Sequence, residues 1–234
     1  MGFLQRFFTN VFRDETSDNH MSSFDQLSED ELEAHLSVMR YGNFSLTDAV
    51  RPSYDLQVVP SQGFRHEIYR DEETNTAVPV VMGAASGEIV FDVFLELLDP
   101  LGAEVDVVLE TSHNQDNRRH DDLYREHIDL PVLKSILCDY EDLLLHDGCT
   151  GIAVLNPNVP LEVQFDEHKL LIAYGSDLSE FEKVFQQNNI PCDSQIKFIT
   201  EAEHVHSSSE KYLEQFQQLT MRLGMDSPLD IPMV

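Results

Sequence analysis

The feature that most constrains the fold is a change of apolar spacing within residues 129–234. Three stretches have the spacing of an amphipathic helix, with apolar stripes from Leu130 to Leu144, from Leu178 to Phe185 and from Tyr212 to Leu223. Short apolar runs predict strands at residues 150–155, 161–165, 169–174, 195–199 and 203–206. The predicted order is α-β-β-β-α-β-β-α, which is typical of an α+β protein.

Capping signals mark two of the expected helix starts. Ser28 and Glu31 have the spacing of a capping box, and Gly42 is a natural stop for the helix that begins after Ser28. Ser207 and Glu210 have the same spacing, so we expect a second capping box at the start of the last helix.

Residues 88–110 alternate between apolar and acidic side chains, as strands with one buried face do. The alternation runs from Glu88 to Leu97 and resumes from Glu104 to Glu110, with a turn-forming sequence between them. The sequence therefore predicts a long antiparallel hairpin, and its polar face carries six carboxylates. Further strands of the same sheet are expected at residues 56–59, 64–69 and 77–82.

Composition divides the chain into three parts. Residues 1–42 hold an N-terminal amphipathic helix, an acidic linker and the helix after Ser28; residues 43–128 are β-rich; residues 129–234 form the α+β unit. All five lysines lie after residue 129 and nine of the ten arginines lie before it, which supports a border there.

The α+β unit resembles the small acidic type III secretion chaperones and their YbjN-like relatives. Residues 140–144 lead through 147–149 into a strand, 161–165 precede their expected partner 170–174, and a covering helix holds 181–185. The resemblance implies a dimer that binds protein segments and uses no nucleotide. It covers less than half of the chain, and the 128 preceding residues depart from the family pattern.

Near the N-terminus, six apolar residues share one face of an expected helix. They are Phe3, Leu4, Phe7, Phe8, Val11 and Phe12. Such a face could pack on the protein's own body or on a second copy, dock in a partner's groove, or rest on a membrane surface. We assign these residues as the candidate partner-binding surface.

The charge balance excludes several partners. The chain has 43 Asp and Glu against 15 Lys and Arg, a formal net charge of −28. A polyanion gains no counterion release from nucleic acid and no electrostatic attraction to anionic lipid. Basic proteins and divalent cations remain possible ligands, and like charge keeps the protein soluble.

Targeting and redox signals favour a cytoplasmic protein. No run approaches the roughly 18 apolar residues of a membrane span, and Arg6 and Arg13 lie within the apolar N-terminal segment, unlike the arrangement in a signal peptide. The three cysteines form no Cys-x-x-Cys motif and no even-numbered set, so we expect reduced, mostly buried thiols.

Recognisable catalytic motifs are absent from the sequence. It has no phosphate-binding loop, no dinucleotide fingerprint, no Gly-x-Ser-x-Gly and no His-Glu-x-x-His. The stretch from Gly83 to Gly87 displaces the serine of a nucleophile elbow by one position and leads into an expected strand, so it predicts a turn. We therefore assign no catalytic residue, no cofactor and no metal.

His204 and His206 offer the strongest alternative. Two residues apart on a strand, they lie on the same side and suit zinc or another divalent metal. Glu201 and Glu203 are near in sequence, and Cys192 could approach only through folding. Two ligands do not complete a metal site, and the simpler interpretation is a polar edge strand.

Two further polar groups carry weaker signals. His113, His120 and His127 lie among acidic residues and could act as bases or ligands, with His120 and His127 on one face if residues 120–127 are helical. The alternative is a solvated linker. The acidic hairpin face could hold calcium, but its carboxylates are spread along extended strands, which favours a solvated surface.

These observations predict a non-enzymatic, chaperone-like or regulatory protein that binds a protein partner through apolar surface, as a homodimer. The alternative is a metal-dependent hydrolase that uses His204, His206 and nearby carboxylates. A third possibility is a module that neutralises a basic partner through its acidic surface.

Overall fold

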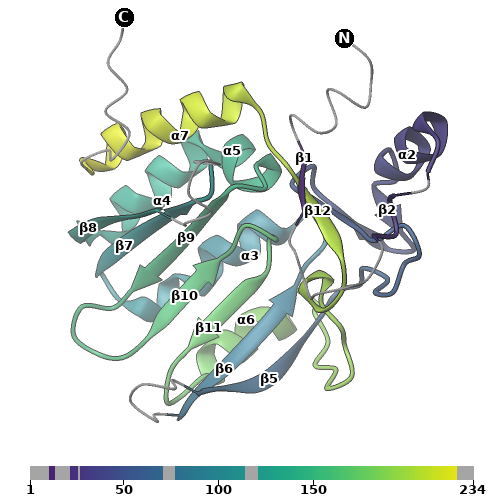
Figure 1. The fold of residues 1–234 in the computed structure, drawn as a ribbon. Coiled ribbons are helices and arrows are strands. Elements are labelled where there is room, and N and C mark those ends of the chain that lie inside the picture. The colour runs from purple at the N-terminus through teal and green to yellow at the C-terminus, as the bar shows by residue number, and fades with distance from the viewer. Residues whose placement is uncertain (1–10, 14–21, 26, 71–76, 114–120, 226–234) are drawn as a thin grey trace, which may run out of the picture.

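A computed structural model describes residues 11–13, 22–25, 27–70, 77–113 and 121–225. The protein has the expected α+β class, and its centre is a seven-stranded sheet in which every neighbouring pair is antiparallel (Figure 1). In spatial order the strands are β5 (Gly63–Arg70), β6 (Ala77–Ala84), β11 (Leu171–Tyr174), β10 (Glu162–Phe165), β9 (Thr150–Leu155), β7 (Glu104–Thr111) and β8 (Asp121–Asp129).

Helices cover one face of this sheet and enclose the main core (Figure 1). They are α3 (Val90–Leu97), α4 (Leu130–Asp139), α5 (Glu141–His146), α6 (Ser179–Gln187) and α7 (Glu210–Leu223). Aromatic rings join helices to strands: Phe94 stacks on Phe165 at 5.1 Å between ring centroids, and Phe185 stacks on Phe64 at 5.0 Å. The core therefore ties the sheet to its helical layer through large buried side chains.

The opposite face of the sheet is covered in part by a short hairpin strand, which carries Phe44, and by a loop, which carries Ile196 and Phe198. Phe44, Ile196 and Phe198 pack there against Val80 and Ile172. The segment at 195–199, expected as a strand, pairs with no strand; it leads into a 3₁₀ turn, η2 (Ile199–Glu201). Its apolar residues signal burial, but they are buried as a loop over the sheet.

A smaller sheet lies at one end of the molecule. Its order is β1 (Val11–Arg13), β12 (His204–Ser207) and β4 (Val50–Pro52), all antiparallel. Next to it are α2 (Glu29–Leu36) and a hairpin of β2 (Arg40–Tyr41) and β3 (Phe44–Ser45). The central strand β12 therefore holds segments from the start of the chain against its C-terminal part.

The prediction of a strand in the first half of the 88–110 hairpin is wrong. Residues Val90–Leu97 form α3, because Val90, Phe91, Phe94 and Leu97 recur at helical spacing and are all buried. The second strand is confirmed as β7, and the turn sequence forms η1 (Asp99–Leu101). Long antiparallel pairing in the β-rich region exists elsewhere, between β5 and β6 and between β7 and β8.

Local signals elsewhere had mixed outcomes. The strands expected at 64–69 and 77–82 are confirmed as β5 and β6, but 56–59 forms no strand and 121–129 is β8, not a helix. The first helix of the α+β unit is divided into α4 and α5 at Tyr140. Residues 150–155, 161–165 and 169–174 correspond to β9, β10 and β11.

The capping predictions also differ in outcome. The Ser28–Glu31 capping box is confirmed, but α2 ends at Leu36, and Gly42 serves instead in the β2–β3 turn with φ of +59°. The second capping box does not form: Ser207 ends β12, and the N-cap of α7 is Ser209, without a side-chain hydrogen bond.

The expected N-terminal helix is wrong where the structure describes it. Val11 and Phe12 belong to β1, opposite Ser207 and His206 of β12, because strand pairing there satisfies the backbone. The other candidate partner-binding residues, Phe3, Leu4, Phe7 and Phe8, lie outside the described residues.

The sheet crosses the composition border at residue 129. Strands β9, β10 and β11 come from the C-terminal part and lie between β6 and β7 of the preceding part. Among the described helices, none is long and apolar enough to cross a membrane.

Candidate metal site

Strand β12 presents two buried histidines on one side. His204 is 1% exposed and His206 is 5% exposed, and Val205 between them points to the other side, where it packs with Phe24 and Leu32. The strand period of two therefore places both imidazoles together, as the sequence predicts.

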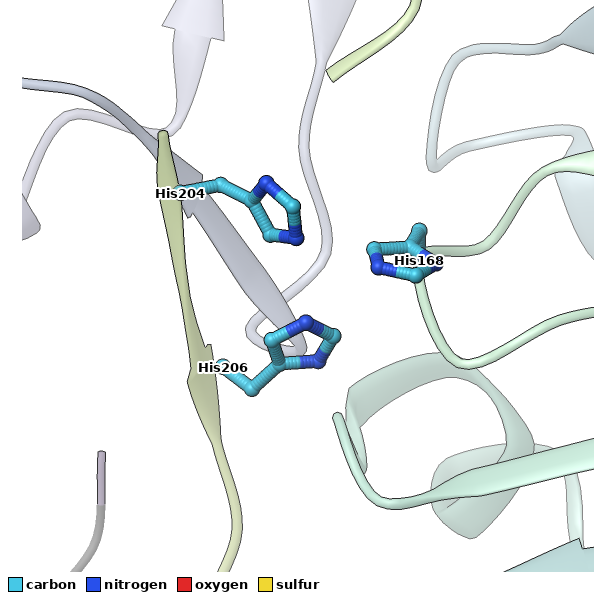
Figure 2. A group of neighbouring side chains, drawn as sticks. All are labelled: His168, His204 and His206. Carbon is cyan, nitrogen blue, oxygen red and sulfur yellow. The ribbon is translucent and has the colours of Figure 1, made fainter. Parts of the chain in front are cut away.

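A third histidine meets them from the turn between β10 and β11. The ring centroid of His168 lies 4.9 Å from that of His204 and 4.7 Å from that of His206, and the latter two rings are 5.1 Å apart. Figure 2 shows the three rings turned toward one another. One nitrogen from each lies within 4.8 Å of the others, so these residues, the histidine cluster, could hold a metal ion.

The turn that carries His168 is built by Asp166. Its Oδ1 accepts a hydrogen bond of 2.7 Å from the Leu170 amide, and its carbonyl accepts one of 3.0 Å from the Lys169 amide. Lys169 adopts φ of +65°, a left-handed conformation that costs a non-glycine residue about 1 kcal/mol. Strained residues of this kind concentrate at functional sites, where the surrounding structure enforces them.

Each ring of the histidine cluster is oriented through its Nδ1. Nδ1 of His204 donates to the Ala202 carbonyl at 2.8 Å, and Nδ1 of His206 donates to the Gly148 carbonyl at 2.7 Å. Nδ1 of His168 is 2.9 Å from Oδ2 of Asp166. A neutral imidazole that carries its proton on Nδ1 has its lone pair on Nε2, so Nε2 is the ligand atom. This is the outer-shell arrangement that metal-binding histidines use.

Asp166 remains a carboxylate in this setting. Burial alone would raise its pKa, but the nearby His168, the Leu170 amide and Lys169 together hold the pKa below its ordinary value. The charge-bearing partner of His168 is therefore in the form that strengthens an imidazole as a ligand.

Gly148 allows β12 to approach the main sheet. A Cβ at this position would lie 2.9 Å from the carbonyl oxygen of Ser207 and closer still to that of Ala49. The Gly148 amide donates to Ser207 at 2.7 Å, and its carbonyl holds His206. Glycine at this position therefore permits a close backbone contact that any side chain would obstruct.

A second polar cluster includes the two residues that flank Gly148 in the sequence. His113, Asp147 and Cys149, the Asp147 cluster, also bring three ligand atoms within 4.8 Å of one another. Nε2 of His113 is 3.1 Å from Oδ2 of Asp147, and its Nδ1 is 2.6 Å from the Thr111 hydroxyl. Both nitrogens of His113 are therefore already engaged within the protein.

Burial also disfavours metal binding by this second cluster. It raises the pKa of the Cys149 thiol to about 12, with the charge of Asp147 acting in the same direction, so the thiolate needed as a ligand is scarce at neutral pH. Of the two clusters, the histidine cluster brings together three ring nitrogens that could hold a metal ion, whereas both nitrogens of His113 in the Asp147 cluster are engaged by Asp147 and Thr111.

Other sequence-predicted ligands lie elsewhere. Glu201 pairs with Arg65 at 2.7 Å, and the Glu203 carboxylate accepts hydrogen bonds from Ser22 and Ser23. Cys192 is exposed. None of these three residues is among the ligand atoms that converge on His204 and His206.

The remaining histidine signals separate in space. His127 is exposed on β8, where Nδ1 lies 3.0 Å from Glu104, whereas His113 is buried in the Asp147 cluster. His120 lies outside the described residues. The acidic hairpin face does not form, because residues Val90–Leu97 are helical.

Sequence reasoning missed His168. The only local signal was a histidine in a short turn between two strands, and such a turn does not indicate which distant strand lies beside it. No protein-family model, curated protein or solved structure matches this chain.

Proposed function

We propose that this protein binds one zinc-class divalent metal ion through His168, His204 and His206, and that the bound metal supports hydrolysis. The observation that carries the proposal is the convergence of three imidazoles, each oriented through Nδ1 by a separate acceptor. Three histidines leave one position of a tetrahedral zinc ion for water or substrate, as in catalytic zinc sites.

The ligand type selects the metal. Imidazole nitrogen favours zinc, cobalt, nickel and copper, whereas calcium and magnesium prefer oxygen ligands. A zinc ion in such a site acts as a Lewis acid and lowers the pKa of its bound water toward neutrality. The chain's contribution is to fix three ligands on rigid backbone: two on β12 and one on a turn organised by Asp166.

Metal binding is tested on the full chain after removal of metal with a chelator. In isothermal titration calorimetry, we expect one equivalent of zinc to bind, and calcium or magnesium at the same concentration to show no binding. The double variant His204→Ala, His206→Ala should lose at least about 100-fold in zinc affinity. His127→Ala, an exposed histidine on β8, is the matched control and should bind as the wild type does.

Hydrolysis is tested separately with zinc-loaded protein. We expect turnover of activated carboxylic esters that requires the metal and is lost in the double variant. Zinc binding without turnover would assign the metal a structural role and contradict the hydrolase. Absence of stoichiometric zinc binding would contradict the whole proposal.

Protein binding is the second candidate function. It is favoured by large apolar side chains on the edge strand β5, where Ile68 is 63% exposed and Tyr69 is 55% exposed. A homodimer, a protein partner and a cytoplasmic location belong to this candidate. Light scattering on the full chain, with Ile68→Lys as the variant, tests it; a monomer at all concentrations that captures no defined partner would contradict it.

A further inference from the structure

A narrow cleft opens beside the histidine cluster. His168 belongs to the cluster and also lines the cleft. Its walls are mainly apolar and include Phe44, Leu46, Val50 and Phe198. The cavity volume is about 40 Å³, room for roughly three water molecules at about 10–15 Å³ each. Only a small group can therefore enter it fully.

The charge of the lining is opposite to that of the protein. The chain carries 43 acidic residues against 15 Lys and Arg, yet among the described residues no Asp or Glu lines the cleft, and two lysines do. They are Lys169 and Lys197. The ammonium of Lys169 is already surrounded by Asp147, Asp166 and Glu167. Among the described residues, the wall of the cleft therefore offers a small anion one available cation, Lys197, and no carboxylate.

The two lysines are available to different degrees. Nζ of Lys169 is buried and donates to the Thr150 carbonyl at 2.9 Å. Lys197 is exposed and forms no ion pair with any residue in the described part of the chain, whereas Lys134, Lys183 and Lys211 each pair with an acid. Lys197 is therefore the group that can move to pair with an incoming anion.

We infer that this cleft binds a small organic carboxylate, with its apolar body against Phe44 and Phe198 and its carboxylate paired with Lys197. A singly charged, apolar acid suits one mobile lysine and an apolar wall. A phosphate group is usually held by arginine forks or several backbone amides, and no arginine in the described part of the chain lines the cleft. The inference deepens the proposed function, on which it rests, by naming the substrate class as a small carboxylate-bearing compound next to the metal.

The experiment measures binding to metal-free full-length protein, so that its result does not depend on the metal. Butanoate, the neutral butanamide and inorganic phosphate are titrated separately by calorimetry or protein-observed NMR. We expect butanoate to bind about fivefold more tightly than butanamide, and Lys197→Gln to remove that difference. Lys183→Gln, at an exposed lysine on α6, is the matched control and should leave it unchanged.

A second variant tests the location. Ser61 is exposed at the cleft, so Ser61→Phe can narrow it without disturbing the core, and it should weaken butanoate and butanamide equally. Equal affinity for butanoate and butanamide, a preference that persists in Lys197→Gln, or tighter binding of phosphate than of butanoate would each overturn the inference. Zinc titration in parallel distinguishes its failure from failure of the metal site.

Discussion

The histidine cluster and the Asp147 cluster are both linked to Gly148, whose carbonyl accepts from His206 and whose sequence neighbours are Asp147 and Cys149. They use similar side chains in different ways. In the Asp147 cluster the side chains bond to one another: His113 to Asp147, and Asp147 also to Thr150. In the histidine cluster each ring is bonded outward through Nδ1, and the rings face one another. The partner of each ring nitrogen, more than the residue type, separates a structural network from a ligand set.

The largest effect is expected where the two clusters meet. Gly148→Ala places a Cβ against the carbonyl oxygens of Ala49 and Ser207, so β12 has to move. We expect a loss of about 3 kcal/mol or more in unfolding free energy, together with weaker zinc binding because the acceptor of His206 shifts. Denaturant unfolding and zinc titration measure the two effects. Gly102→Ala is the comparison for backbone strain without steric contact, because that glycine has a φ of +99° and meets only one side-chain atom, at 3.6 Å. Unchanged zinc affinity in a folded Gly148→Ala protein would contradict the expected coupling between Gly148 and the histidine cluster.

Asp147→Asn tests the network alone. The carboxylate is fully buried, and replacing it leaves His113 and Thr150 without their charged acceptor, at a cost of about 3 kcal/mol. Zinc stoichiometry of the folded variant should stay at one, measured by elemental analysis. Loss of zinc from a folded Asp147→Asn protein would break the distinction between the clusters.

The same variant carries a pH signature. Burial alone would raise the pKa of Asp147, but the hydrogen bond and charge of His113, with Ser208 and Thr150, keep it below its ordinary value. A lowered folded-state pKa gives stability that is present above about pH 4, the ordinary pKa of an aspartate, and is lost as pH falls through the folded value. The difference in unfolding free energy between wild type and Asp147→Asn should therefore shrink below about pH 4. A difference that is constant with pH would contradict the assignment of Asp147 as an ionised acceptor.

Asp166→Asn tests the histidine cluster with a smaller change. Asparagine keeps an oxygen for the Leu170 amide but removes the charge beside Nδ1 of His168, so the turn persists and the ligand is less basic. We expect zinc affinity to fall about 10- to 100-fold, measured by competition with a chelator, with little change in unfolding free energy. Asp177→Asn is the control, because Asp177 also accepts a backbone hydrogen bond but lies at the start of α6. Equal zinc affinities in Asp166→Asn and Asp177→Asn would contradict the role of Asp166 in supporting the metal ligand His168.

The smallest effect concerns Cys149, which should take no part in metal binding. With a thiol pKa of about 12 it stays protonated and unreactive at pH 8, whereas the exposed Cys138 and Cys192 react with a thiol reagent. We expect two reactive thiols in the folded protein and a third after unfolding. Cobalt bound in place of zinc should show no thiolate-to-metal charge-transfer absorption. Such an absorption band would indicate that Cys149 binds the metal, and would therefore place the metal in the Asp147 cluster.

The sequence could predict those elements whose apolar pattern fits only a helix or only a strand. Strand β9, helix α6 and helix α7 follow directly from apolar periodicity. Helix α3 was missed because its residues satisfy both periods: Phe91, Val93 and Leu97 alternate as in a strand, while Val90, Phe91 and Phe94 form a helical face. Packing against the sheet, α6 and α5 decides between them, and that packing is not encoded locally.

By itself, the sequence determined the α+β class, the order of most C-terminal elements and the pairing of His204 with His206 on one side of a strand. These depend on periods of 2 and 3.6 residues, which the chain carries in its own pattern. Only the tertiary structure decided that β9 to β11 lie in the middle of the sheet and that His168 meets β12. Strand neighbours and turn positions are set by pairing and burial between distant segments, so the third ligand is a property of the fold.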